Sequence, residues 1–130
     1  MDKIILDTNI WVSYFNSEDS QAQRSVELVE SLAKKGTLFI VPNYIDLECI
    51  SVLNAKCSVQ HALEWMDFRD RADQVERMTF SEEDHRQICA LFAKMQTKKL
   101  SLVDMSLLYL SELGYSVLTF NQQLRKLLPG

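Results

Sequence analysis

The first residue in a position to do chemistry is Asp7, which directly follows the short apolar stretch "KIIL" (3–6). A carboxylate at the end of a buried strand is costly to desolvate unless a partner compensates its charge. Thr8 and Asn9 follow at once, and apolar residues resume only after them. This grouping predicts that the polar side chains at the end of the stretch bind a partner together.

A second carboxylate lies on the apolar side of a predicted helix. Glu48 shares a helix face with Ile45 and Val52, which are three and four residues away. The neighbouring acid Asp46 is turned away from Glu48 by about 160° and is expected to face solvent. An alternative for Glu48, which its position alone leaves open, is a partly exposed helix acid without a function.

A third carboxylate, Asp104, lies near the start of a helix predicted over 101–114, in the apolar stripe that contains Leu107 and Leu108. Ser101 and Asp104 also have the S-x-x-D spacing of a capping box, which would explain Asp104 as a local stabiliser of the helix end. A capping carboxylate does not have to lie among leucines, so both interpretations remain open.

Strands that alternate with helices must position these acids. Strands are expected at 3–6, 37–41, 74–78 and 116–119, and helices at 10–15, 20–35, from Pro42, at 58–71, 81–95, 101–114 and 122–128. This order predicts one domain over residues 1–130, an α/β protein with three α/β/α layers and a central parallel sheet of four to five short strands. In such sheets ligands lie at the carboxyl ends of the strands, which is where Asp7 and Asn121 are expected.

Three carboxylates in one crevice repel one another, and their pKa values would rise unless a cation relieved the repulsion. All the candidate ligands are oxygen donors, and the sequence has no cluster of Cys and His that would suit zinc. The pattern therefore favours Mg²⁺ or Mn²⁺ bound by Asp7, Glu48 and Asp104.

Composition limits the classes of partner. The formal net charge of −4 argues against a DNA-coating protein or a membrane-surface binder, but it does not exclude a nucleic-acid enzyme whose acidic site binds a cation. No apolar run has the length of a signal peptide or a transmembrane helix. The sequence has an odd number of cysteines, which are expected to be reduced, mostly buried thiols of a cytoplasmic protein: Cys49, Cys57 and Cys89.

The chain resembles PIN-domain proteins of the VapC-like kind, which are metal-dependent endoribonuclease toxins of toxin–antitoxin systems. The resemblance is carried by "ILDTNIW", "VPNYIDLECISVL" and "LSLVDMSLLYLSELGYSVLTFN", in the family's order and spacing. It implies that Asp7, Glu48 and Asp104 bind the metal. The family commonly has a fourth acid at the position of Asn121, so Asn121 is also expected to bind the metal, through an amide oxygen that brings no charge. Further residues are expected to support the site: Thr8, Asn9, Ser101 and Thr119.

The activity that the resemblance implies is hydrolysis of RNA phosphodiester bonds, with the metal holding a phosphate oxygen and lowering the pKa of a bound water. Cationic residues near the same edge are expected to contact RNA phosphates, although ordinary solvated helix ends would explain each of them: Lys98, Lys99, Arg125 and Lys126. The family further implies an antitoxin protein that covers the acidic crevice, and a homodimer.

The sequence supports other functions less well. A catalytically weak PIN domain that binds RNA or a protein is the main alternative, and Asn121 is its best support. A phosphoacceptor signalling domain would require adjacent acids after the first strand, and a haloacid-dehalogenase-type phosphatase would require D-x-D there. Residue 9 is Asn and Asp7 stands alone, so the pattern disfavours both.

Overall fold

The computed structural model describes residues 2–129, and the terminal residues 1 and 130 of the predicted domain lie outside the described part. Within this part the strands are β1 (Lys3–Leu6), β2 (Leu38–Pro42), β3 (Val75–Met78) and β4 (Ser116–Leu118). The helices are α1 (Thr8–Phe15), α2 (Ala22–Lys34), α3 (Asn43–Lys56), α4 (Val59–Arg71), α5 (Glu82–Met95), α6 (Leu102–Glu112) and α7 (Gln122–Arg125). The predicted order of strands and helices is confirmed.

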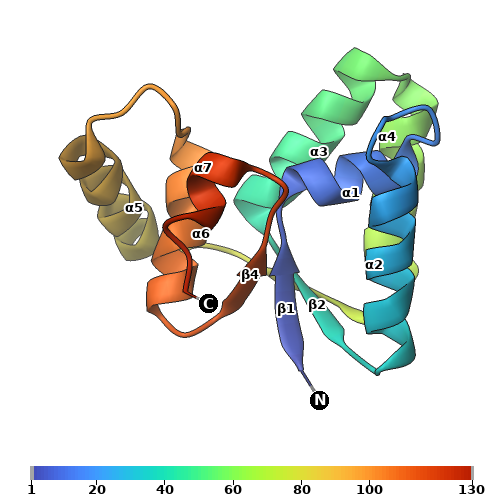
Figure 1. Ribbon diagram of the computed structural model, residues 1–130, viewed down its shortest axis with the longest axis horizontal. Coiled ribbons are helices and arrows are strands. Elements are labelled where there is room, and N and C mark those ends of the chain that lie inside the picture. Colours follow the sequence, from blue (N-terminus) through green and yellow to red (C-terminus); the bar gives the residue numbers. More distant parts are fainter. Residues whose placement is uncertain (1, 130) are drawn as a thin grey trace.

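The four described strands form one parallel sheet in the order β3-β2-β1-β4. Ile5 in β1 pairs with Ile40 in β2 and with Val117 in β4. Because parallel connections are right-handed, the path from β1 to β3 puts α1–α4 on one face, and the return to β4 puts α5 and α6 on the other. Figure 1 shows the sheet between these two helical layers, so the predicted α/β/α fold is confirmed.

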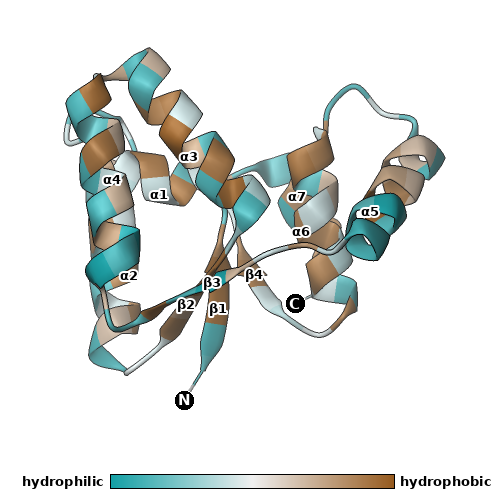
Figure 2. Cartoon of the chain, turned by 180° about the vertical axis from the view of Figure 1, so that it is seen from behind, coloured by the Kyte–Doolittle hydropathy of each residue, from teal (hydrophilic) through white to brown (hydrophobic). Residues whose placement is uncertain are grey.

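The core lies on both faces of the sheet. The inner strands are apolar almost throughout, as expected for a parallel sheet that helices cover on both sides, and Figure 2 shows brown colour along much of β1 and β2, as well as on parts of the helices. Trp11 of α1 and Trp65 of α4 are fully buried, with ring centroids 5.2 Å apart. Trp11 is therefore a core residue.

Local signals set the ends of several helices. Gly36 and Gly114 follow α2 and α6 with φ angles of 80° and 105°, in the left-handed region that glycine enters most easily. Pro42, expected to open a helix, is the last residue of β2 and the N-cap of α3. Its missing N–H costs nothing there, because the first N–H groups of a helix have no partner inside that helix.

The expectation that Asp46 faces solvent is wrong. Asp46 is 8 % exposed, and its Oδ1 accepts hydrogen bonds from Trp65 Nε1 at 2.9 Å and from Arg69 Nε at 2.6 Å. Both partners belong to α4, which packs against the side of α3 opposite Glu48. The buried guanidinium of Arg69 compensates the charge of Asp46, and such a long-range partner cannot be recognised from helical spacing.

The described residues contain no helix that is both long and apolar enough to cross a membrane. All three cysteines are free thiols, as expected, but only Cys49 is buried, whereas Cys57 and Cys89 are half-buried.

Candidate active site

A pocket of about 310 Å³ lies at the carboxyl ends of the strands. It is lined by the four predicted polar residues, which reach it from the end of β1, from α3, from α6 and from the segment after β4: Asp7, Glu48, Asp104 and Asn121. Figure 1 shows why these segments meet, because α1, α3 and α7 begin where β1, β2 and β4 end. The fold thus brings together residues that the sequence separates by more than a hundred positions.

Asp7 is the most buried acid of the pocket, with 4 % of its surface exposed. Its Oδ1 accepts a 2.7 Å hydrogen bond from the backbone N–H of Thr8, and its Oδ2 accepts one of 2.6 Å from the hydroxyl of Thr119. The pKa of Asp7 is raised to about 6, with burial as the largest cause. The two hydrogen bonds oppose this rise, and the negative charges of Asp104 and Glu48 add to it. Asp7 is therefore a carboxylate with an incompletely compensated charge.

Asn9 links this acid to the last strand. Its Nδ2 lies 3.3 Å from Asp7 Oδ2 and 3.2 Å from Thr119 Oγ1, and its Oδ1 accepts a 3.2 Å bond from the N–H of Phe120. The hydroxyl of Thr8 is buried and has no hydrogen-bond partner within the described residues. Thr8, Asn9 and Thr119 thus surround Asp7, at the positions where supporting residues were expected.

Asp104 caps a helix and lines the pocket at the same time. Its Oδ2 accepts a 2.8 Å bond from the N–H of Ser101, and its own N–H donates to Ser101 Oγ at 3.1 Å, which completes the predicted capping box. Its Oδ1 has no hydrogen-bond partner among residues 2–129. One carboxylate oxygen is therefore fixed by the capping box, and the other is available for a ligand.

Glu48 is half-buried and forms neither a hydrogen bond nor an ion pair within the described part of the chain. Val52 and Lys56 follow it at intervals of four residues along α3, and they line the same pocket. Glu48 is therefore partly exposed, as the alternative interpretation had it, but it is exposed toward a pocket that contains three further acids.

Asn121 lines the pocket and also caps a helix. It is the N-cap of α7, and its Oδ1 accepts bonds from the N–H groups of Gln123 at 2.9 Å and Leu124 at 3.2 Å. This is the oxygen that metal binding would require. A cation would have to compete with two backbone donors for it.

Sequence reasoning missed two charged residues of the pocket, Asp19 and Lys56. Lys56 lies eight residues after Glu48, close to the same helix face, so helical spacing could have found it. Asp19 lies in the turn between α1 and α2, where its Oδ1 accepts a bond from the N–H of Gln21. No periodicity could have placed Asp19 in the pocket.

The predicted RNA-binding cations lie around this edge rather than in the pocket. Lys98, Lys99 and Lys126 are exposed and are not among the residues that line it. Arg125 lines a neighbouring groove, where its Nη2 donates a 3.0 Å bond to the carbonyl of Thr119.

The donors of the pocket suit a hard cation, since they are carboxylate and amide oxygens. Within residues 2–129, however, no three Asp, Glu, His or Cys side chains lie close enough together to hold a metal ion as they stand. Glu48 can change rotamer without breaking a described hydrogen bond or ion pair, and Asp104 offers a free oxygen while its other oxygen stays in the capping box. The chemistry of the donor set therefore fits a metal that draws the side chains together.

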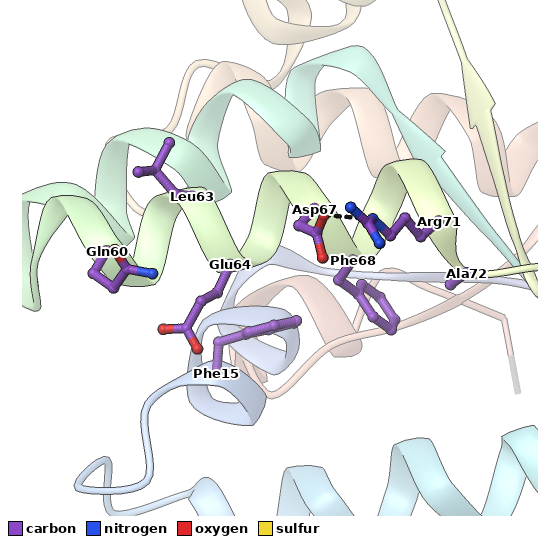
Figure 3. Close-up of a pocket in the computed structure, with 8 residues that line it drawn as sticks. All are labelled: Phe15, Gln60, Leu63, Glu64, Asp67, Phe68, Arg71 and Ala72. Carbon is purple, nitrogen blue, oxygen red and sulfur yellow. Dashed lines mark ion pairs between the residues drawn. The ribbon is translucent and has the colours of Figure 1, made fainter.

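A second hollow, of about 580 Å³, lies along the outer side of α4 and the end of α1 (Figure 3). Its charged residues include Asp67 and Arg71, which pair with each other at 2.7 Å, as the dashed line in the figure marks. Glu64 remains as a single acid beside Phe15 and Phe68. This hollow therefore has no group of acids comparable to that of the pocket at the strand ends.

The family model described as PIN domain matches residues 4–127. Among solved structures, the chain resembles VapC20 of Mycobacterium tuberculosis, described as a Sarcin-Ricin loop cleaving toxin, with a TM-score of 0.82, 18 % identity and coverage of 95 % of this chain and 93 % of that one. It also resembles VapBC2 of Rickettsia felis bound to a DNA fragment from its promoter, with a TM-score of 0.66, 17 % identity and coverage of 98 % and 93 %. No curated protein sequence matches the chain.

Proposed function

The chain belongs to the PIN-domain family, and on this premise we propose that it is a metal-dependent endoribonuclease, the toxin of a toxin–antitoxin pair. The observation that carries the proposal is the meeting of Asp7, Glu48 and Asp104, from three separate segments, in one pocket at the carboxyl ends of the strands. Burial and the charges of the other two acids raise the pKa of Asp7, so a cation would find an uncompensated charge there.

The structural neighbours support the substrate class. VapC20 is described as a toxin that cleaves the Sarcin-Ricin loop, and its fold extends over 95 % of this chain. Since identity to it is only 18 %, the likeness concerns the fold, and RNA as the substrate is our proposal for this chain.

We assign Mg²⁺ or Mn²⁺ to Asp7, Glu48 and Asp104, because all three offer carboxylate oxygens. When bound, such a cation neutralises charge on a phosphate and lowers the pKa of a coordinated water. We leave Asn121 out of this ligand set, because its Oδ1 already accepts two hydrogen bonds from α7.

Neighbouring residues fix the positions of the proposed metal ligands. Thr119, Asn9 and the N–H of Thr8 fix the carboxylate of Asp7, and Ser101 fixes one oxygen of Asp104. Supporting groups of this kind typically change metal affinity or activity by about 10–100-fold when they are removed. The ammonium group of Lys56 is the cation of the pocket and could contact an RNA phosphate beside the acids.

An acidic pocket of this kind suits an antitoxin that places a basic side chain among the carboxylates. RNA as the target and an antitoxin as the partner both imply a cytoplasmic location. These assignments, like the homodimer, follow from the family resemblance.

The second candidate function is a binding module with weak or no catalysis, and the neutral Asn121 at the site favours it. A module of this kind would bind RNA or a protein with the same pocket but would not hydrolyse RNA when Mg²⁺ or Mn²⁺ is added.

An RNA cleavage assay separates the two candidates. We expect the wild-type protein to cleave single-stranded RNA in Mg²⁺ or Mn²⁺, to be inactive in EDTA, and to lose activity in Asp7→Asn and Glu48→Gln. Absence of cleavage by a folded wild-type protein with either metal would favour the binding module. Cleavage that persists in EDTA and in both variants would rule out the proposed site.

A further inference from the structure

A groove of about 760 Å³ runs beside the acidic pocket, along the open edge of the sheet that β4 forms. One wall comes from α2 and the other from α7 and the segment that follows it. Figure 1 shows these two walls on either side of β4. Nothing in the proposed chemistry of the acidic pocket requires this groove.

The groove contains the two arginines that lack an acidic partner. Four of the six arginines in the sequence, all in 69–86, form ion pairs with carboxylates. Arg24 and Arg125 form none within residues 2–129, and both line the groove. In a chain with a net charge of −4, two unpaired guanidinium groups at one place suit an anionic ligand.

An aromatic ring joins the groove to the acidic pocket. Phe120 lines both, and the guanidinium of Arg24 lies 4.1 Å from the centre of its ring. The N–H of Phe120 donates to Asn9, whose side chain also contacts Asp7. The ring therefore has a defined position relative to the proposed metal ligand.

We propose that this groove binds the nucleotide next to the cleaved phosphate of a single-stranded RNA. This inference rests on the proposed function. The base takes the place of the Arg24 guanidinium on the ring of Phe120, as bases stack on aromatic rings in many single-strand binding sites. The guanidinium groups of Arg24 and Arg125 then contact its phosphates. Phe120 and the two arginines are then positioning residues that align the strand with the acidic pocket.

The two unpaired guanidinium groups of the groove favour an anionic ligand such as RNA over an apolar peptide. Its apolar members are mostly buried or half-buried, including Ile10 and Leu28, whereas Arg24, Arg125 and Glu27 are exposed. Glu27 is the acid of the groove and accepts a 3.3 Å bond from Gln23. Because Glu27 would repel a phosphate, its replacement by Gln is expected to strengthen RNA binding.

The test measures the affinity of a short fluorescein-labelled single-stranded RNA in an Asp104→Asn background, which prevents hydrolysis. We expect Arg24→Gln combined with Arg125→Gln to weaken binding tenfold or more, and to reduce the slope of log K against log salt by about 0.7 for each lost phosphate contact. Phe120→Ala should weaken binding by about 5-fold or more, the effect of losing one base stack.

The control is Arg71→Gln, which removes an arginine from the surface of Figure 3 and should leave RNA affinity unchanged. Arg24→Lys keeps the positive charge, and Phe120→Leu keeps the apolar bulk. Thermal unfolding checks that every variant is folded. With active protein, loss of the two arginines should raise KM more than it lowers kcat.

Unchanged RNA affinity in the folded groove variants, with cleavage by the wild type intact, would overturn the groove assignment and leave the proposed function standing. A folded wild-type chain that neither binds nor cleaves RNA would instead refute the proposed function, and the groove assignment with it. If the groove variants kept their RNA affinity but lost binding of a co-expressed antitoxin, the groove would belong to a peptide, which also overturns the inference.

Discussion

The hydroxyl of Thr119 donates a 2.6 Å hydrogen bond to Oδ2 of Asp7, across 112 positions of sequence. This bond joins the ends of β1 and β4, which are neighbours in the sheet. Because it stabilises the charged form of a buried acid, it opposes the effect of desolvation on the pKa of Asp7. Thr119 thereby helps to keep Asp7 ready to bind a cation.

Replacing Thr119 with Val should remove this bond at nearly constant volume. We expect metal affinity or RNA cleavage to fall by about 10–100-fold, as for other residues that support a metal ligand, with a loss of about 1 kcal/mol of stability. Calorimetric titration with Mn²⁺ and an RNA cleavage assay measure the two effects. Thr37→Val is a matched control, because the Thr37 hydroxyl is buried without a hydrogen-bond partner in the described part of the chain. Equal effects of the two substitutions on cleavage would contradict the role of Thr119.

The pKa of Asp7 predicts how the stability of the metal-free protein depends on pH. The pKa is about 6 in the folded chain, against an ordinary value of 3.8. Between these values the folded state binds the proton more tightly than the unfolded state does, so stability falls as pH rises from about 4 to 6. The loss from this group is about 3 kcal/mol, and Asp7→Asn should lack it.

Chemical denaturation in EDTA at several pH values measures this effect as the difference between the wild type and Asp7→Asn. Addition of Mn²⁺ at pH 7 should restore stability to the wild type only, because ligand binding stabilises the folded state. A difference between the two proteins that stays constant from pH 4 to 7 would show that burial does not shift the titration of Asp7.

The chain has two capping boxes of the same type, and comparing them distinguishes an effect on helix stability from an effect on RNA cleavage. Ser101 with Asp104 caps α6, and Ser81 with Asp84 caps α5. We expect Ser101→Ala and Ser81→Ala to lower stability by a similar amount, about 1 kcal/mol. Only Ser101→Ala should reduce RNA cleavage, because only Asp104 lines the acidic pocket. Thermal unfolding and a cleavage assay test the pair, and a loss of activity in Ser81→Ala of the same size would contradict the assignment.

Asn121→Asp should strengthen Mg²⁺ binding and RNA cleavage. It adds a negative charge at a residue that lines the pocket, and Asp is as good an N-cap as Asn, so α7 should keep its cap. Mg²⁺ titration and cleavage rates measure the gain. A binding module would show no cleavage with either residue, so an inactive Asn121→Asp variant with improved Mg²⁺ affinity would favour the alternative function.

The fold could be predicted from the sequence because the local signals for strands and helices agree with the overall α/β/α arrangement. The run "KIIL" and the helical spacing of 22–33 identify β1 and α2 with bounds within two residues of those observed. The rule that ligands gather at the carboxyl ends of parallel strands then placed Asp7 and Asn121 at one edge. Helical spacing and the S-x-x-D pattern predict both positions of Asp104, in a capping box and on the inward side of its helix.

Positions that depend on packing between helices could not be predicted in this way. Asp46 and Glu48 lie two residues apart on α3, and helical spacing predicts that Asp46 is exposed and that Glu48 faces inward. The partner of Asp46 is Arg69 on α4, and nothing in the spacing of α3 indicates which side α4 covers. The same holds for Asp19, which a turn carries into the pocket.

The most direct test of the shared cation is calorimetric titration of the metal-free protein with Mn²⁺, for the wild type and for Asp7→Asn, Glu48→Gln and Asp104→Asn. We predict saturable binding by the wild type, a strong loss of affinity in each of the three variants, and wild-type affinity in the control Asp84→Asn. Wild-type affinity retained in all three variants, or no binding by a folded wild-type protein, would contradict this prediction.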